Sequence, residues 1–395
     1  MTATEIGVYV HVPWCLKKCP YCDFLSVAAE RPSLPHKAYA DSVIAELERR
    51  VETLGDVRLE SIFFGGGTPS LWEPEELGRV LSRIRELLPN AAPEVEITVE
   101  CNPTSFDAER GRALQSVGVN RVSIGVQGLD ADRLQFLGRL HDVGSGLRAV
   151  QDAIASGMPR VSADFIFGVS GQAADAAARE ARILSELGTT HLSAYALTIE
   201  PGTQFGALAR KGKLPLLDEA AVADSFLAVE HTLESAGFEH YEVSNYAKRG
   251  AQSRHNLGYW IGRSYLGLGC GAWGTLNERG ARYRYRNTPS PERYVAAAAS
   301  WATADLSAVS PLVAQYEALS AETALAERIM LGLRLASGID LERSAADLGT
   351  ELWTPERARA RDRLVAQGKL TLQGSVAAIP KRHWLFADGI ISALM

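Results

Sequence analysis

The chain has 395 residues, 46% hydrophobic and 22% charged, a composition typical of a folded soluble protein with one large core and a smaller one. Its 41 Lys and Arg residues against 47 Asp and Glu residues give a formal net charge of −6, which argues against attraction of the whole chain to nucleic acid or anionic lipid. No apolar run is long enough to span a membrane and the first residues lack a signal-peptide pattern, so we expect a cytoplasmic protein.

Over the first 250 residues, short runs of β-branched and aromatic residues alternate with longer amphipathic stretches. Seven runs predict strands: Ile6–Val12, Ser61–Gly65, Val95–Glu100, Arg121–Gly125, Val161–Gly168, Leu192–Leu197 and His240–Val243. Apolar residues repeat every three to four positions between them, which predicts helices over residues 39–54, 75–88, 108–117, 147–155 and 173–187. Repeated strand–helix–strand units require right-handed crossovers and a mainly parallel sheet. Residues 1–250 therefore predict an α/β fold, either a (βα) barrel or an open sheet.

The pattern changes after residue 250. Residues 259–274 are rich in Gly, Tyr and Trp, and residues 282–286 alternate Arg and Tyr like an edge strand. We expect residues 251–310 to cover the barrel rather than to continue its repeat. Three helices and a hairpin across Gln373–Gly374 then predict a small winged-helix-like domain over residues 311–395.

Three of the five cysteines lie close together after the first predicted strand. Cys15, Cys19 and Cys22 have the spacing C-x3-C-x2-C, which in a reducing compartment indicates metal ligation rather than disulfides. Three thiolates on one loop can each bind one iron of a [4Fe-4S] cluster and leave the fourth iron without a protein ligand. Structural zinc needs four ligands, but no second CxxC is present and the conceivable fourth ligand, His11, precedes the loop.

The cysteine loop, together with Gly65-Gly66-Gly67-Thr68-Pro69 after the second predicted strand, resembles the radical S-adenosylmethionine superfamily. That resemblance implies a partial (βα)6 TIM-like barrel, a [4Fe-4S] cluster on the three cysteines, and S-adenosylmethionine on the open iron. Glycines fit such a site because residues without Cβ let the backbone approach a ligand closely. The residues that the resemblance assigns to S-adenosylmethionine are Tyr9, Tyr21, Gly66, Gly67, Thr68, Glu100, Gln127, Arg139, Asp164 and Ala196.

Within the superfamily, segments along nearly the whole chain resemble the oxygen-independent coproporphyrinogen III oxidase group. Two branches of this group compete: the porphyrinogen oxidase and the HemW family, which is associated with heme binding and delivery. Phe24 stands where the oxidase branch has a fourth cysteine, and only fourteen residues precede Cys15, where the oxidase has a longer extension. Residues 255–260 also match the HNxxYW motif of the HemW family. These three features favour HemW.

The HNxxYW motif offers groups that could contact heme. A neutral His255 can ligate iron, and Tyr259 and Trp260 present flat apolar faces to a macrocycle. An alternative interpretation is structural, with His255 capping a loop and Trp260 filling a seam between domains.

The expected function is therefore a heme chaperone that carries the cluster and exchangeable S-adenosylmethionine and passes heme to acceptor hemoproteins. A homodimer and peripheral contact with membrane hemoproteins are compatible with this function. The resemblance leaves open whether the chain is also an enzyme, and the alternative is the coproporphyrinogen oxidase. A minor alternative is nucleic-acid binding through Arg357, Arg359, Arg361 and Arg363, which the net acidity disfavours.

Overall fold

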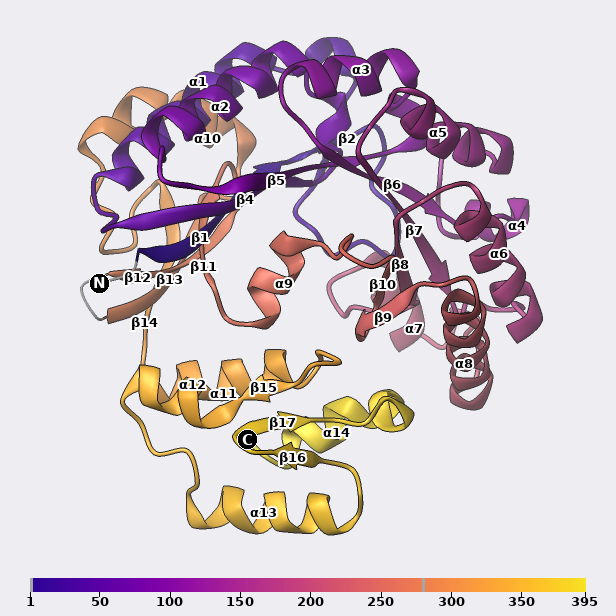
Figure 1. The fold of residues 1–395 in the computed structure, drawn as a ribbon. Helices are drawn as coiled ribbons and strands as arrows, with labels where there is room; N and C mark the ends of the chain where they lie inside the picture. Colours follow the sequence, from indigo (N-terminus) through magenta and orange to yellow (C-terminus); the bar gives the residue numbers. More distant parts are fainter. Residues whose placement is uncertain (1–2, 279–280) are drawn as a thin grey trace.

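The computed structural model describes residues 3–278 and 281–395, and its centre is a curved parallel sheet (Figure 1). Six neighbouring strands of this sheet run in parallel and end at the same rim. They are β1 (Thr4–Val12), β4 (Val57–Gly66), β5 (Ala91–Cys101), β6 (Arg121–Gln127), β7 (Arg160–Phe167) and β8 (His191–Ala196). The predicted α/β fold with a partial (βα)6 barrel is confirmed.

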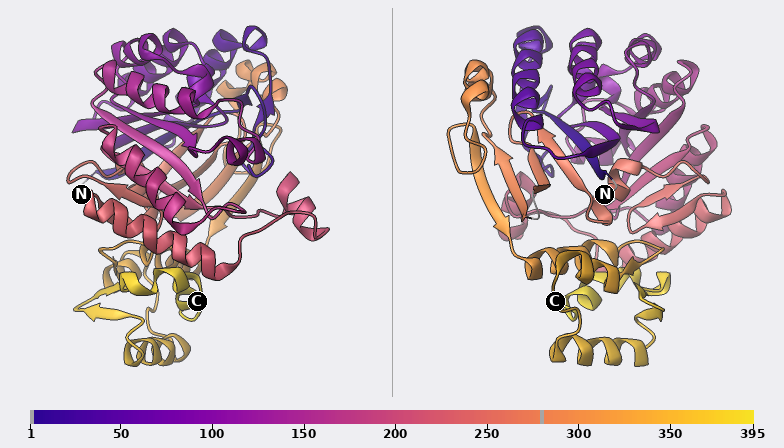
Figure 2. Two further views of the ribbon diagram at one scale, coloured as in Figure 1. Left: turned by 90° about the vertical axis from the view of Figure 1, so that its right-hand side faces the viewer. Right: turned by 60° about the vertical axis from the view of Figure 1, so that its left-hand side comes forward.

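Helices pack around the outer face of this sheet, as two further views show (Figure 2). They include α1 (His36–Val51), α2 (Pro74–Leu87), α3 (Ala108–Ser116), α4 (Ala131–Phe136), α5 (Val143–Ala155), α6 (Ala174–Glu186) and α8 (Glu219–Ser235). Helix α7 (Gln204–Arg210) instead lies beside the cysteine loop, where the Phe205 amide donates to the Pro20 carbonyl over 2.9 Å. In α2, the buried residues Leu77, Val80, Leu81 and Ile84 recur at helical spacing and face the sheet. Pro74 at its first position and acidic residues in its first turn favour the start of the helix there.

Residues 251–310 were expected to cover the barrel rather than to continue its repeat; in the structure the segment after residue 250 adds strands to the large sheet. Strand β11 (Ser264–Leu268) pairs in parallel with β1, and the antiparallel strands β12 (Trp273–Glu278), β13 (Ala281–Asn287) and β14 (Val313–Leu319) follow. The Arg/Tyr run lies in β13 between β12 and β14, so the prediction of an edge strand was wrong. Alternating residues indicate that a strand has two unlike faces, and they carry no information about its number of neighbours. Strand β14 also belongs to this sheet, although the sequence grouped residues from 311 onward with the C-terminal domain.

Shorter elements complete the large unit. Strands β9 (Glu239–Glu242) and β10 (Asn245–Ala247) extend the other side of the sheet, and β2 (Trp14–Cys15) pairs with β3 (Val27–Ala28) across the cysteine loop. Helix α9 (Arg254–Trp260) lies within the curve of the barrel in Figure 1, and α10 (Pro291–Ala296) packs beside α1.

The C-terminal unit follows the winged-helix order of helices and strands. It contains α11 (Ala321–Gly332), β15 (Ile339–Asp340), α12 (Leu341–Leu348), α13 (Pro355–Ala366), β16 (Thr371–Gln373), β17 (Val376–Ala378) and α14 (Ala387–Ser392). Its small sheet has the order β15-β17-β16. Two backbone hydrogen bonds join this unit to β9 and its turn, from Val243 to Arg334 and from Ala336 to Tyr241.

The arginines of α13 do not share one exposed basic face. Arg357 is buried and donates to the carbonyls of Leu352 and Leu394. Arg359 pairs with Glu356, and Arg361 pairs with Asp362. This arrangement gives no support to a phosphate-binding surface. In the described part of the chain, no helix is both long and apolar enough to cross a membrane.

Candidate functional site

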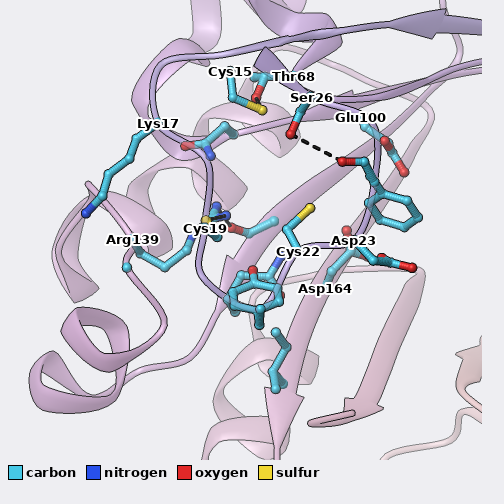
Figure 3. A pocket seen from close by; sticks show the side chains of 18 of the residues that line it. Cys15, Lys17, Cys19, Cys22, Asp23, Ser26, Thr68, Glu100, Arg139 and Asp164 are labelled. Carbon is cyan, nitrogen blue, oxygen red and sulfur yellow. Dashed lines mark hydrogen bonds between the residues drawn. The ribbon is translucent and has the colours of Figure 1, made fainter. Parts of the chain in front are cut away.

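A cavity of about 410 Å³ lies at the carboxyl ends of the parallel strands (Figure 3). Most of the residues singled out from the sequence line it: Cys15, Cys19, Tyr21, Cys22, Gly66, Gly67, Thr68, Glu100, Gln127, Arg139, Asp164 and Ala196. They come from the cysteine loop, from the ends of β4, β5, β6 and β8, from β7, and from the loop after α4. The parallel sheet thus gathers residues that lie far apart in the chain around one cavity.

The cysteine loop is held at the edge of this cavity by local hydrogen bonds. The Cys22 amide donates to the Cys19 carbonyl over 3.2 Å, and Lys18 Nζ donates to the Phe24 carbonyl over 3.1 Å. Thr68 Oγ1 donates to Cys15 Sγ over 3.4 Å, which links the loop to the end of β4. The loop therefore presents its thiols on a scaffold built by two strands.

The three thiols line the same cavity, as the ligands of a cubane cluster would. No group of three or more His, Cys, Asp or Glu side chains among the described residues converges as around a single metal ion. A cubane needs no such convergence, because each thiolate binds a different iron. Burial raises the pKa of the Cys15 thiol and raises that of Cys22 to about 11, and a bound cationic metal would favour the thiolates that burial disfavours.

His11 is not available as a fourth ligand in this structure. Its Nδ1 is hydrogen-bonded to the Tyr9 hydroxyl over 2.9 Å, and its Nε2 to the Leu25 carbonyl over 2.8 Å. Tyr9 itself does not line the cavity, although the sequence placed it at the S-adenosylmethionine site. Its ring stacks on Phe63 in the barrel interior, with the ring centroids 6.2 Å apart.

Two acidic side chains line the cavity from β5 and β7, the strands on either side of β6. Glu100 accepts a hydrogen bond from the Gly66 amide over 3.0 Å, and Asp164 accepts one from Ser123 Oγ over 2.9 Å. Burial, reinforced by the charge of Asp164, raises the pKa of Glu100 to about 8. Burial raises the pKa of Asp164 to about 6. A cationic ligand would offset both shifts, so the pair suits an ammonium or sulfonium group.

The backbone around the cavity leaves no room for larger residues. A Cβ atom on Gly66, whose φ is +110°, would lie 2.5 Å from the His11 ring. A Cβ on Gly67 would lie 2.6 Å from the Trp14 carbonyl oxygen, a backbone atom that cannot swing aside. This close contact explains the need for glycine between the end of β4 and the cysteine loop.

Arg139 reaches the cavity from the loop after α4. Its Nη2 donates to the Gly125 carbonyl over 2.8 Å, and Nη1 lies 3.7 Å from Cys19 Sγ. Its buried Nε has no hydrogen-bond partner, and an unsatisfied buried donor is costly unless a ligand or water pairs with it. This arrangement suits a carboxylate ligand.

The HNxxYW residues lie away from this cavity. His255 is 3% exposed; its Nδ1 is hydrogen-bonded to Ser61 Oγ and its Nε2 to the Tyr259 hydroxyl, each over 2.9 Å. Its ring stacks on Phe63 with the centroids 4.9 Å apart. Burial and the nearby Arg263 lower the pKa of His255 to about 3. Since both ring nitrogens have partners, this conformation favours the structural interpretation of His255 over axial ligation of heme.

Tyr259 belongs to the same interior cluster, and Trp260, the last residue of α9, is half-buried. The Tyr259 ring meets those of His255 and Tyr265 edge to face, and the Trp260 Nε1 is buried without a partner. Glu96 accepts hydrogen bonds from the backbone amides of Arg254 and His255, which fixes the start of α9 inside the barrel. Helix α9 therefore fills part of the barrel interior behind the cavity.

Several residues that line the cavity were not among the site residues predicted from the sequence, although Phe24 was noted there as a feature that separates the two branches. They include Leu16, Lys17, Phe24, Ser26, Ser123, Leu140 and Tyr195. Leu140 and Tyr195 each adjoin a residue that was predicted, Arg139 and Ala196 respectively. For these two residues, adjacency to a predicted site residue was the signal in the sequence that could have identified them.

Comparisons with known proteins agree with this geometry. The family model of the radical SAM superfamily matches residues 9–182, and that of the HemN C-terminal domain matches residues 319–386. The fold matches that of coproporphyrinogen III oxidase (HemN) from Escherichia coli with a TM-score of 0.78. That match covers 99% of this chain and 90% of the oxidase, at 17% sequence identity, and so concerns the fold alone.

Relatives with higher sequence identity to this chain are named heme chaperones rather than oxidases. Heme chaperone HemW from Mycobacterium tuberculosis is 34% identical to this chain over 100% of its length and 96% of the relative. Heme chaperone HemW from Haemophilus influenzae is 39% identical over 73% of this chain and 76% of the relative. The corresponding Escherichia coli protein is 41% identical over 69% and 70%. With the three-cysteine cavity in its partial barrel and relatives along its full length, the chain belongs to the HemW family of the radical SAM superfamily.

Proposed function

We propose that this protein binds heme and transfers it to an acceptor hemoprotein. The observation that carries this proposal is its relatedness, along the whole chain, to a protein named as a heme chaperone. Phe24 supports it further, because an apolar side chain borders the cavity where the oxidase branch has an additional cysteine.

Cys15, Cys19 and Cys22 would hold a [4Fe-4S] cluster whose open iron takes S-adenosylmethionine. Gly66, Gly67 and Thr68 would hold the methionine end of that ligand beside the cluster. Glu100 and Asp164 would offset its positive charge, Arg139 would receive its carboxylate, and Gln127 and Ala196 would border its nucleoside. Together the cluster and S-adenosylmethionine would supply one-electron reductive chemistry. The protein's part is to orient both groups and to exclude water from the cavity.

Anaerobic reconstitution followed by heme titration tests this function. The reconstituted protein should bind heme saturably, seen as a shift of the Soret band, and should pass it to an apo-hemoprotein. Cys19→Ser should lower the iron content and slow the transfer. Absence of saturable heme binding by the wild-type protein would refute the proposal.

The second candidate function is coproporphyrinogen III oxidation, which the shared fold favours. It is decided on the same sample by an anaerobic assay with coproporphyrinogen III, reductant and S-adenosylmethionine. We expect no protoporphyrinogen, and its clear formation would establish the oxidase instead.

We also propose that the protein acts in the cytoplasm, where acceptors would include hemoproteins at the membrane that it contacts peripherally. A homodimer is compatible with this role. Size-exclusion chromatography with light scattering, with and without heme, measures the oligomeric state.

A further inference from the structure

Exposed apolar side chains gather at the mouth of the cluster cavity. Phe24 is 61% exposed, Leu140 is 55% exposed and Leu16 is 36% exposed, yet all three line the cavity together with Tyr195. We call these four residues the apolar rim. A single exposed apolar residue needs no explanation, but several around one opening mark a binding surface.

The rim comes from separate parts of the chain that the fold brings together. Leu16 lies between Cys15 and Cys19 on the cysteine loop, and Phe24 follows the last cysteine by two residues. Leu140 comes from the loop after α4, and Tyr195 lies near the end of β8. A ligand that covers the rim would therefore lie directly over the cysteine loop and the ends of the strands.

The apolar rim is bordered by a few charged side chains of both signs. Lys17 lines the cavity, extends outward in Figure 3, and forms no ion pair among the described residues. Asp23 and Glu200 also border the cavity, so the rim is not a basic field that attracts any anion. One free ammonium beside an apolar surface suits a flat apolar ligand that carries a carboxylate at its edge.

Heme has this chemistry, with an apolar macrocycle and two propionates. The other candidate for its binding, His255, is buried, both of its ring nitrogens are hydrogen-bonded, and the cavity does not reach it. Ligation by His255 would require one ring nitrogen to lose its partner, Ser61 or Tyr259, and heme to enter the barrel interior, whereas the apolar rim is open as it stands.

We propose that heme docks across the mouth of the cluster cavity, with the face of its macrocycle on the apolar rim and a propionate on Lys17. This inference rests on the proposed function and specifies where the cargo sits.

Heme titration of the reconstituted full-length protein tests the location. Phe24→Ser combined with Leu140→Ser should raise the Kd for heme at least about tenfold, because two apolar contacts are lost. Phe24→Leu keeps an apolar side chain and should retain most of the affinity. Lys17→Glu should weaken binding by a few fold, and more at low than at high salt.

The matched control is Leu227→Ser, which removes an apolar side chain of 50% exposure from α8, away from the cavity lining. It should bind heme as the wild-type protein does. Iron content and melting temperature, measured for every variant, separate a lost contact from a lost fold.

The outcomes distinguish the two proposals. If the wild-type protein binds no heme, the proposed function fails and the docking site fails with it. If the wild-type protein binds heme and the folded rim variants bind equally well, only the docking site is wrong. A loss of binding confined to a folded His255→Gln variant would place heme at α9 and overturn the rim.

Discussion

At the scale of single residues, Glu100 links the chemistry of the cavity to pH. Its carboxyl accepts from the Gly66 amide, and burial near Asp164 raises its pKa to about 8 from the ordinary 4.5. Protonation is therefore favoured in the ligand-free cavity, and a cationic ligand favours the opposite state.

We accordingly expect the affinity for S-adenosylmethionine to rise with pH between about 6 and 8, with release of a proton on binding. Calorimetric titration in buffers of different ionisation enthalpy measures this proton. Glu100→Gln should bind more weakly and lose most of the pH dependence. Wild-type affinity that stays constant across this range would contradict the assignment.

Gln127 is the one non-glycine residue with positive φ in the described ranges, at +66° at the end of β6. The left-handed conformation costs roughly 1 kcal/mol for a residue with a Cβ. A strained residue that lines a cavity indicates that its side chain is needed there.

Gln127→Gly should weaken binding of S-adenosylmethionine about tenfold, an effect of about 1.4 kcal/mol. The free energy of unfolding should change by less than about 1 kcal/mol, since relief of backbone strain is offset by the greater entropy of the unfolded chain. Gln127→Ala removes the amide but keeps the strain. It should bind as weakly as the glycine variant without any gain in stability, as urea unfolding can show.

The sequence predicted the part of the site that depends on strand order. Polar residues after successive parallel strands, such as Glu100, Gln127 and Asp164, must meet at one rim whatever the details of packing. It did not predict the apolar rim, because exposed apolar residues such as Phe24 and Leu140 have no periodicity of their own. The burial of His255 also escaped prediction, since a histidine that binds a ligand and one that packs inside a barrel have the same local sequence.

At the scale of elements, α9 depends on one buried ion pair. Glu96 is fully buried; it pairs with Arg121 over 3.1 Å and accepts the amides of Arg254 and His255. Arg121 also donates to the carbonyls of Ala251 and Gln252. The ion pair therefore fixes both the residues that precede α9 and the first turn of the helix.

Glu96→Ala should lower the free energy of unfolding by about 3 kcal/mol or more, because a buried arginine and two amides lose their acceptor. Glu94 is the matched control on the same strand: it is exposed and pairs with Arg160 and Arg254. Glu94→Ala should cost less than about 1 kcal/mol. Equal losses in urea unfolding would show that Glu96 does not hold α9.

Elements with strong periodicity could be predicted from the sequence, whereas pairings between distant strands could not. The helix predicted over residues 108–117 is α3, which spans 108–116, and the strands of the barrel lie within a few residues of their predicted bounds. The pairing of β11 with β1 joins residues more than 250 positions apart. Nothing in the local sequence of either strand specifies that partner.

At the scale of the whole molecule, the barrel and the C-terminal unit share one hydrophobic core. Trp384 of the C-terminal unit meets the His240 ring of β9 edge to face, with the centroids 4.4 Å apart. The Trp384 Nε1 donates to the Ile379 carbonyl over 3.0 Å, and the side chain is buried. We therefore expect the two units to unfold together.

Trp384→Ala should uncouple them, because loss of a buried tryptophan costs about 3–5 kcal/mol at this junction. Calorimetry should show one transition for the wild-type protein and two for the variant. Phe386→Ala, two residues away and 65% exposed in the native chain, should keep a single transition. Two transitions in the wild-type protein would mean that the junction carries little coupling.

The position of α9 inside the barrel also bears on the order in which heme and S-adenosylmethionine would bind and leave. Helix α9 fills the barrel interior away from the apolar rim, and the cavity that the cysteines line opens at the mouth that this rim surrounds. Heme lying across that mouth would trap S-adenosylmethionine beneath it, so the last molecule to enter would be the first to leave. S-adenosylmethionine would then be exchanged only after heme had been delivered, because both ligands would use the same opening.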